Sequence, residues 1–170
     1  NPIRKSAKDA WKRFQLMEWL KDLNRTDRLN EVGAGLIGDL GVDVLLQSSF
    51  VSKLEKLDLK NNDLTDVSVI ALSRSEKLKR LISLNLSKNN ITDAGAKALA
   101  ESSILGKLKK LDLNFNRIGD EGARAIAGSS NFSNLESLKL GQNKIGTEGA
   151  QALNESKTLQ NLVHPIFGFY

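Results

Sequence analysis

Apolar and polar residues alternate over several short stretches of this chain, and each stretch leads into apolar residues at helical spacing. The stretches begin at Leu54, Leu81, Leu108 and Leu135. Each follows the pattern L-x-x-L-x-L-x-x-N-x-(I/L). Alternation predicts a strand with one buried face, whereas residues such as Ala96, Leu99 and Ala100 recur as on one face of a helix. Each unit is therefore predicted to be one strand followed by one helix.

The units recur at a constant interval of 27 residues, as the positions of their first leucines show. The interval continues toward the amino terminus, because Ile37 stands 27 residues before Leu64 and the stretch IGDLGVDVLL repeats the helical half. Toward the carboxyl end, Leu162 opens a last expected strand, in which Pro165 replaces the inner leucine. One strand and one helix cannot bury their own leucines, so the units must stack. The sequence thus predicts a solenoid with parallel strands inside the curve and helices outside it.

The 27-residue unit resembles the leucine-rich repeat, and its half N-x-I-x-x-x-G-A-x-x-L-A is similar to the ribonuclease-inhibitor-like subfamily. The resemblance implies an α/β fold: a right-handed leucine-rich repeat solenoid with a parallel β-sheet on the concave face and helices on the convex face. We expect residues 27–170 to form this solenoid. The short, cysteine-free units look like those of leucine-rich repeat proteins that intracellular bacteria deliver into host cells.

One asparagine and one small residue recur in each unit. The asparagines are Asn62, Asn89, Asn116 and Asn143. Where the chain turns inward from a strand, buried N–H and C=O groups lack partners, and an amide side chain can satisfy both kinds. Leaving such a group unpaired costs about 1–3 kcal/mol, so we interpret the asparagines as a structural ladder. The small residues are Gly41, Ser68, Gly95, Gly122 and Gly149, where we expect the outer helices to pack closely.

The first 26 residues differ from the repeats and are expected to form an N-terminal capping helix. Trp11, Phe14, Met17 and Leu20 recur at helical spacing, with Lys and Arg on the other side. A basic amphipathic helix of this kind also suits a membrane surface or a partner helix. An open-ended solenoid needs a cover over its first unit, which favours the cap.

Composition narrows the function classes. The net charge is +5, and residues 1–28 hold eight Lys/Arg against four Asp/Glu, so the excess lies mainly in the first segment. The chain has no cysteine, which excludes disulfides and thiol chemistry and favours a cytoplasmic location, the host cytoplasm for a delivered effector. No apolar run approaches the length of about 20 residues that spans a bilayer. The chain begins at Asn1 rather than at Met, so we expect a fragment or a processed form.

The sequence predicts no enzyme, no cofactor and no metal site. His164 is the only histidine and has no Cys or acidic cluster beside it, and we expect it on a strand surface. The stretch GAGLIG, residues 33–38, matches the glycine pattern of dinucleotide-binding loops, but the segment before it is too polar for a central parallel strand. Asp58 and Asp112 are expected two strands apart, roughly 10 Å, and solvated.

The architecture offers a binding surface instead. Strand positions between the leucines are expected on the concave face, together with Phe115, whose counterparts in the other units are polar. The candidate protein-binding residues are Lys56, Asp58, Lys60, Asn85, Ser87, Lys110, Asp112, Asn114, Phe115, Ser137 and Lys139. The resemblance implies recognition of another protein over this face, and one form of it is inhibition of an enzyme by covering the active site. Phe115 is expected to be an anchor of the interface or to pack on Arg117 or a neighbouring loop.

The partner is therefore expected to be another protein, bound by a monomeric chain in a heterocomplex, rather than a small-molecule substrate. The alternative is an electrostatic binder of nucleic acid or anionic membrane through the basic first segment. Six further cations support that alternative, namely Lys77, Lys79, Arg80, Lys107, Lys109 and Lys110. An aromatic content of 5% and mixed charges on the strand face argue against it.

Overall fold

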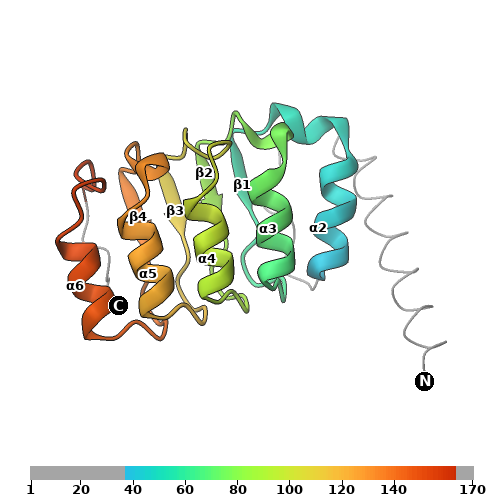
Figure 1. The fold of residues 1–170 in the computed structure, drawn as a ribbon. Coiled ribbons are helices and arrows are strands. Elements are labelled where there is room, and N and C mark those ends of the chain that lie inside the picture. Colours follow the sequence, from blue (N-terminus) through green and yellow to red (C-terminus); the bar gives the residue numbers. More distant parts are fainter. Residues whose placement is uncertain (1–36, 164–170) are drawn as a thin grey trace, which may run out of the picture.

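The structure is a computed structural model that describes residues 37–163, in which helices stand side by side in front of a row of strands (Figure 1). The α-helices are α2 (Gly38–Gln47), α3 (Asp66–Arg74), α4 (Asp93–Ala100), α5 (Asp120–Ala127) and α6 (Thr147–Asn154). The strands are β1 (Lys56–Asp58), β2 (Ser83–Asn85), β3 (Lys110–Asp112) and β4 (Ser137–Lys139). Short 3₁₀ turns are η1 (Ser49–Lys53), η2 (Glu76–Leu78) and η3 (Ser130–Phe132).

The strands form one open, four-stranded sheet in the order β1-β2-β3-β4, and each neighbouring pair is parallel. Leu57 is in register with Leu84, and Leu84 with Leu111, so the register equals the repeat interval. The predicted α/β solenoid, with its sheet on the concave face and its helices on the convex face, is confirmed. Each strand is only three residues long, shorter than the alternation predicts, although backbone hydrogen bonds to the next unit continue beyond it, as from the N–H of Asn61 to Ser87.

The repeated apolar positions fill the space between sheet and helices. In the central unit Leu108, Leu111, Leu113 and Ile118 are at most 1% exposed. Phe132, in η3, is fully buried and takes the place that leucine has in the two units before it. The core therefore runs along the whole solenoid, and each unit completes the core of its neighbours.

The predicted asparagine ladder is present. The amide oxygen of Asn116 accepts a hydrogen bond from the N–H of Ile91, 3.0 Å away, in the preceding unit. Its amide nitrogen donates to the carbonyls of Leu86 and Leu113, both 3.0 Å away. Asn62, Asn89 and Asn143 make equivalent bonds to their own preceding units. The ladder thus satisfies the inward-turning backbone, as its chemistry predicts.

A second ladder, of aspartates, joins the amino-terminal ends of the helices, and sequence reasoning missed it. Asp66, in the first turn of α3, accepts hydrogen bonds from the N–H groups of Thr92 (2.8 Å) and Gly95 (3.0 Å) at the start of α4. Equivalent bonds are made by Asp39, Asp93 and Asp120. A carboxylate at a helix amino terminus is favourable, because it pairs with free N–H groups and with the helix dipole.

This ladder corrects the interpretation of the small residues. A Cβ atom at position 95 would lie 2.5 Å from Asp66 Oδ1, and one at position 122 would lie 2.6 Å from Asp93 Oδ1. The space is therefore taken by a carboxylate of the preceding unit as well as by helix packing. At the equivalent position of α3, Ser68 contributes to this ladder, because its hydroxyl donates a hydrogen bond to Asp39. Burial raises the pKa of Asp39, but the hydrogen bonds from Ser68 and Thr65 outweigh it and hold the pKa below its ordinary value of 3.8.

Serines form a third connection, at the carboxyl-terminal ends of the helices. The hydroxyls of Ser102, Ser129 and Ser156 donate to the carbonyls of Ser73, Ala100 and Ala127 in the preceding units. The predicted capping helix (residues 1–26), most of the segment GAGLIG, His164 and Pro165 lie outside the described residues.

Candidate protein-binding surface

The outward side chains of the sheet form two rows across the units. The first row holds Lys56, Ser83, Lys110 and Ser137, and the second holds Asp58, Asn85, Asp112 and Lys139. Together they line an open hollow of about 730 Å³ on the concave face, with Glu136 and Val163 at its carboxyl-terminal end. The structure therefore brings most of the predicted site residues together on one surface, at the spacing of neighbouring strands.

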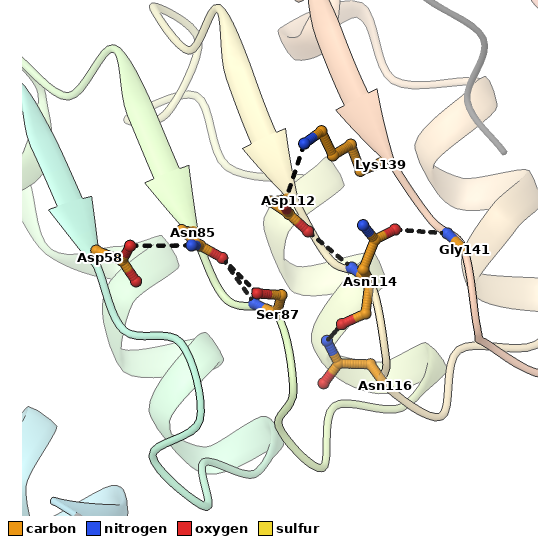
Figure 2. A network of polar contacts seen from close by, with 8 residues as sticks. All are labelled: Asp58, Asn85, Ser87, Asp112, Asn114, Asn116, Lys139 and Gly141. Carbon is orange, nitrogen blue, oxygen red and sulfur yellow. Dashed lines mark hydrogen bonds and ion pairs between the residues drawn. The ribbon is translucent and has the colours of Figure 1, made fainter. Parts of the chain in front are cut away.

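The second row is largely held by internal hydrogen bonds (Figure 2). Asp58 accepts from the amide nitrogen of Asn85 at 3.0 Å and from the N–H of Lys60 at 2.9 Å. Asp112 accepts from the N–H of Asn114 at 3.0 Å and lies 3.8 Å from the ammonium of Lys139. These side chains cap the strand ends, a role that the sequence analysis did not assign to them.

The predicted site residues that follow the strands do not continue the face. Ser87 is 5% exposed, and both its N–H and its hydroxyl donate to the side-chain oxygen of Asn85, so this residue offers a partner little surface. The side-chain oxygen of Asn114 accepts from the N–H of Gly141 at 2.7 Å, as Figure 2 shows. Lys60 lies beyond β1 but is exposed.

Lysines are the exposed part of the concave face. The exposed residues are Lys56, Lys110 and Lys139, whose side chains extend away from the sheet. Ser137 is half-buried. The ammonium groups can reach a partner without losing a strong internal bond, since among residues 37–163 only the ammonium of Lys139 approaches a carboxylate. The surface that the sheet offers thus carries exposed lysines over a polar, hydrogen-bonded floor that includes carboxylates.

Phe115 lies just beyond the concave face, in the loop that follows β3. It is 48% exposed, and its φ of +56° is in the left-handed region. That conformation costs a residue with a side chain about 1–2 kcal/mol. The ammonium of Lys88, one unit earlier, lies 5.4 Å from the centre of the ring, so the local contact of Phe115 is a cation on one face of the ring.

The two aspartates of the face do not form a catalytic pair. They occupy equivalent positions two strands apart, with Asn85 between them in the register. Each accepts a backbone N–H bond at one carboxylate oxygen, which fixes its orientation at the strand end. Within residues 37–163 no group of three or more His, Cys, Asp or Glu residues could hold a metal ion.

Three of the six cations that support the alternative electrostatic function form bonds within the solenoid. Lys77 donates to three carbonyls at the end of α2, from Leu46, Gln47 and Ser48. Arg80 lies 3.6 Å from Glu55, and Lys109 lies 2.7 Å from Glu136. Half of this set therefore serves the solenoid itself. None of the helices in the described part of the chain has the length and apolar character needed to cross a membrane.

The fold is an open solenoid of strand–helix units with a polar concave sheet, and it places this chain among the repeat proteins. The leucine-rich repeat family model ("Leucine Rich repeat") matches residues 52–73, 79–100, 107–127 and 133–153. The chain belongs to the leucine-rich repeat proteins. The matched segments coincide with the units between β1 and α6.

A comparison with solved structures gives a match of low similarity. A crystal structure of an internalin from Listeria monocytogenes is 19% identical, with a TM-score of 0.29, over 70% of this chain and 48% of that chain. This chain thus spans about half the length of that internalin chain. No curated protein sequence matches this chain.

Proposed function

We propose that this chain recognises another protein through the concave face of its sheet and performs no chemistry of its own. The observation that carries the proposal is the set of exposed lysines on a fixed floor. Lys56 and Lys110 project from equivalent positions of β1 and β3, and Lys139 from β4. The polar side chains between them are already held by hydrogen bonds, so binding would order few groups, which favours affinity.

Binding energy is expected to concentrate in a central cluster. The cluster consists of Lys110, Asp112 and Lys139 on the sheet and Phe115 at its margin. Exposed aromatic residues are enriched among the few side chains that dominate protein interfaces. Lysines at the margin of an interface mainly raise the rate of association.

The resemblance supports a finer proposal. Helices of eight to ten residues in every unit support the ribonuclease-inhibitor-like type. Inhibition of an enzyme by covering its active site is then one form of the recognition, with the chain acting as a monomer that enters a heterocomplex. The short, cysteine-free units support the analogy with leucine-rich repeat proteins delivered into host cells, for which the site of action is the host cytoplasm.

A further part of the proposal concerns domain organisation. We assign residues 27–170 to the solenoid and residues 1–26 to a cap over its first unit. Among the described elements, α2 has a helix, α3, on one side only, and a solenoid end of this kind needs a cover. Deletion of residues 1–26 is expected to cause aggregation. An unchanged melting curve and a monomeric truncated chain would refute the cap.

The function is tested by affinity capture with three baits, each the full chain. The first is the wild type, the second carries Lys110→Glu and Lys139→Glu, and the third carries Lys97→Glu and Arg124→Glu. The third bait is the matched control, because Lys97 and Arg124 are exposed on α4 and α5, away from the sheet. Partners of the concave face are proteins that the first and third baits retain and the second loses.

The affinity of such a partner is then measured for single variants. Phe115→Ala is expected to weaken binding by more than about 1 kcal/mol, and charge reversal at Lys110 or Lys139 to slow association. Equal affinity for every variant would show that the concave face is not the binding site.

A further inference from the structure

The loops that follow the strands form a continuous edge of the solenoid, here called the strand-end rim. It comprises residues 60–65, 87–92, 114–119 and 141–146. Backbone hydrogen bonds stack these loops, since the N–H groups of Lys88 and Phe115 donate to Asn114 and Gly141 of the following units, each at 2.9 Å. Equivalent rim positions therefore lie about 5 Å apart, as neighbouring strands do.

Each loop of the rim carries one exposed cation. They are Lys60, Lys88, Arg117 and Lys144. None of these side chains lies within 4.0 Å of a carboxylate of residues 37–163, whereas Arg80 and Lys109, on the loops that lead into β2 and β3, are paired. The rim thus concentrates cations that the solenoid does not use.

Four carboxylates in and beside the rim accept hydrogen bonds from the solenoid itself. Asp63 is the only acidic residue within the rim loops, and it accepts a hydrogen bond from the side chain of Asn90 at 2.6 Å. Asp66, Asp93 and Asp120, at the helix starts beyond the rim, accept the N–H groups of the next unit. The rim sequence therefore has four cations against one anion.

Phe115 stands in the middle of these cations. Its left-handed backbone suits glycine or asparagine better, and about half of its side chain is exposed. Neither its packing nor its conformation accounts for an aromatic residue at this place. Because the Lys88 ammonium lies over one face of the ring, the other face and the ring edge are what a partner can contact.

From this arrangement we propose that the strand-end rim binds a short, extended acidic segment of a partner protein, with an apolar side chain of that segment against Phe115. The inference rests on the proposed function and names the chemistry of the partner. The four cations lie on successive units, at three different positions of the loop, and the units themselves span three strand spacings, about 15 Å, which an extended chain covers in about five residues. Two or more acidic side chains in such a segment would each lie near a cation of the rim.

The rim fits a protein segment better than a nucleic acid. Single strands bind through several aromatic residues on which successive bases stack, and the rim has one. One face of that ring is already covered by Lys88. A nucleic acid is therefore the competing outcome of the test.

The experiment selects peptides of about twelve random residues, displayed on phage, against the full chain. We expect enriched sequences with at least two acidic residues beside an apolar one. The enriched peptide is then synthesised with a fluorescent label and titrated with variants. Phe115→Ala and the charge reversals Lys88→Glu and Arg117→Glu are each expected to weaken binding by at least about five-fold. Lys79→Glu and Lys107→Glu, exposed cations outside the rim, are the matched controls and should leave binding within about two-fold.

Several outcomes would overturn the inference: no enrichment, enriched peptides without acidic residues, or peptides that bind the rim variants and the wild type equally. Binding of a labelled 20-nucleotide single strand that the rim variants abolish would assign the rim to nucleic acid instead. A captured partner protein that is lost by Lys110→Glu and Lys139→Glu but kept by Lys88→Glu and Arg117→Glu would refute the rim and leave the proposed function standing. A captured partner protein that binds both sets of variants as well as the wild type would refute the rim and the proposed function together.

Discussion

The carboxylate of Asp66 and the backbone N–H of Gly95 form a hydrogen bond of 3.0 Å between two neighbouring units. The same oxygen would lie 2.5 Å from a Cβ atom at position 95, so the bond and a side chain cannot coexist without a shift. This relationship recurs between Asp93 and Gly122 and between Asp120 and Gly149. A carboxylate on one helix therefore accounts for a glycine on the next.

Gly95→Ala is expected to lower the free energy of unfolding by about 1–3 kcal/mol, because the new methyl group displaces the Asp66 carboxylate and presses on Ile91. Helix propensity alone predicts the opposite sign, since alanine is about 1 kcal/mol better than glycine inside a helix. Urea denaturation measures the difference. Gly128→Ala is the control, because its nearest neighbour would be at 3.5 Å, an ordinary contact. A stabilising Gly95→Ala would disprove the carboxylate explanation.

Asp39→Asn is expected to make stability less dependent on acidic pH. The pKa of Asp39 is lowered in the folded chain, so its ionised form is favoured by folding. The resulting stabilisation is fully present above the unfolded pKa and is lost as the pH falls through the folded pKa. The gap in unfolding free energy between wild type and variant should therefore be about 1 kcal/mol at neutral pH and shrink below about pH 4.

The matched control for this titration is Asp43→Asn, an exposed carboxylate on the same helix whose only recorded bond is from Gln47. Its gap to the wild type should be small at every pH. A gap for Asp39→Asn that stays constant between neutral pH and pH 3 would contradict the role of the charged form.

Asn116→Ala is expected to cost about 1–3 kcal/mol, because it leaves the buried N–H of Ile91 without its partner. The carbonyls of Leu86 and Leu113 each lose one of two amide donors and keep the other, from Asn89 and Asn143. Asn143→Ala makes the same change in a half-buried rung, where water can replace the amide, and should cost less. Thermal and urea unfolding of both variants provide the comparison. Equal small losses would mean that the ladder contributes little to stability.

Leu113→Ala should remove about 2–5 kcal/mol of stability, because it opens a cavity at a fully buried position of the central unit. Val67→Ala, at a side chain that is 66% exposed, is the control and should change stability by less than about 0.5 kcal/mol. Denaturant titration that shows under half a kcal/mol for Leu113→Ala would indicate that this leucine does not pack as described.

Phe115→Asn is expected to leave stability unchanged or to raise it by up to about 1 kcal/mol, because asparagine tolerates the left-handed conformation better. The same variant should weaken binding of a partner that contacts the ring. A melting curve and a binding isotherm for one preparation separate the two effects. A loss of more than about 1 kcal/mol in unfolding free energy would assign Phe115 a structural role.

The sequence by itself determined the repeat interval, the type of each element and the role of the asparagines. These features depend on local periodicity and on the chemistry of an amide beside unpaired backbone groups, both of which are visible in a linear pattern. The leucines at 57, 84, 111 and 138 are buried in register as the 27-residue interval predicts. Stacking then follows because one unit cannot bury its own apolar face.

The aspartate ladder was present in the sequence but could not be interpreted from it. Asp39, Asp66, Asp93 and Asp120 recur at the same interval as the leucines. An acidic residue in the first turn of a helix is explained locally by that helix's own dipole, so nothing in the pattern points to the next unit. Only the stacking of the helices places each carboxylate against the N–H groups of its neighbour.

Tertiary structure alone decided which polar residues of the face are available to a partner. Ser87 has the same spacing from its strand leucines as Lys60, yet one is buried and the other exposed. The serine side chain is short and donates to the side-chain oxygen of Asn85, whereas the lysine side chain makes no such bond within residues 37–163 and extends into solvent. Whether a lysine is free or paired also depends on the residue that the neighbouring unit places beside it. The ammonium of Lys109 lies 2.7 Å from the carboxylate of Glu136, which is 27 residues away in the sequence.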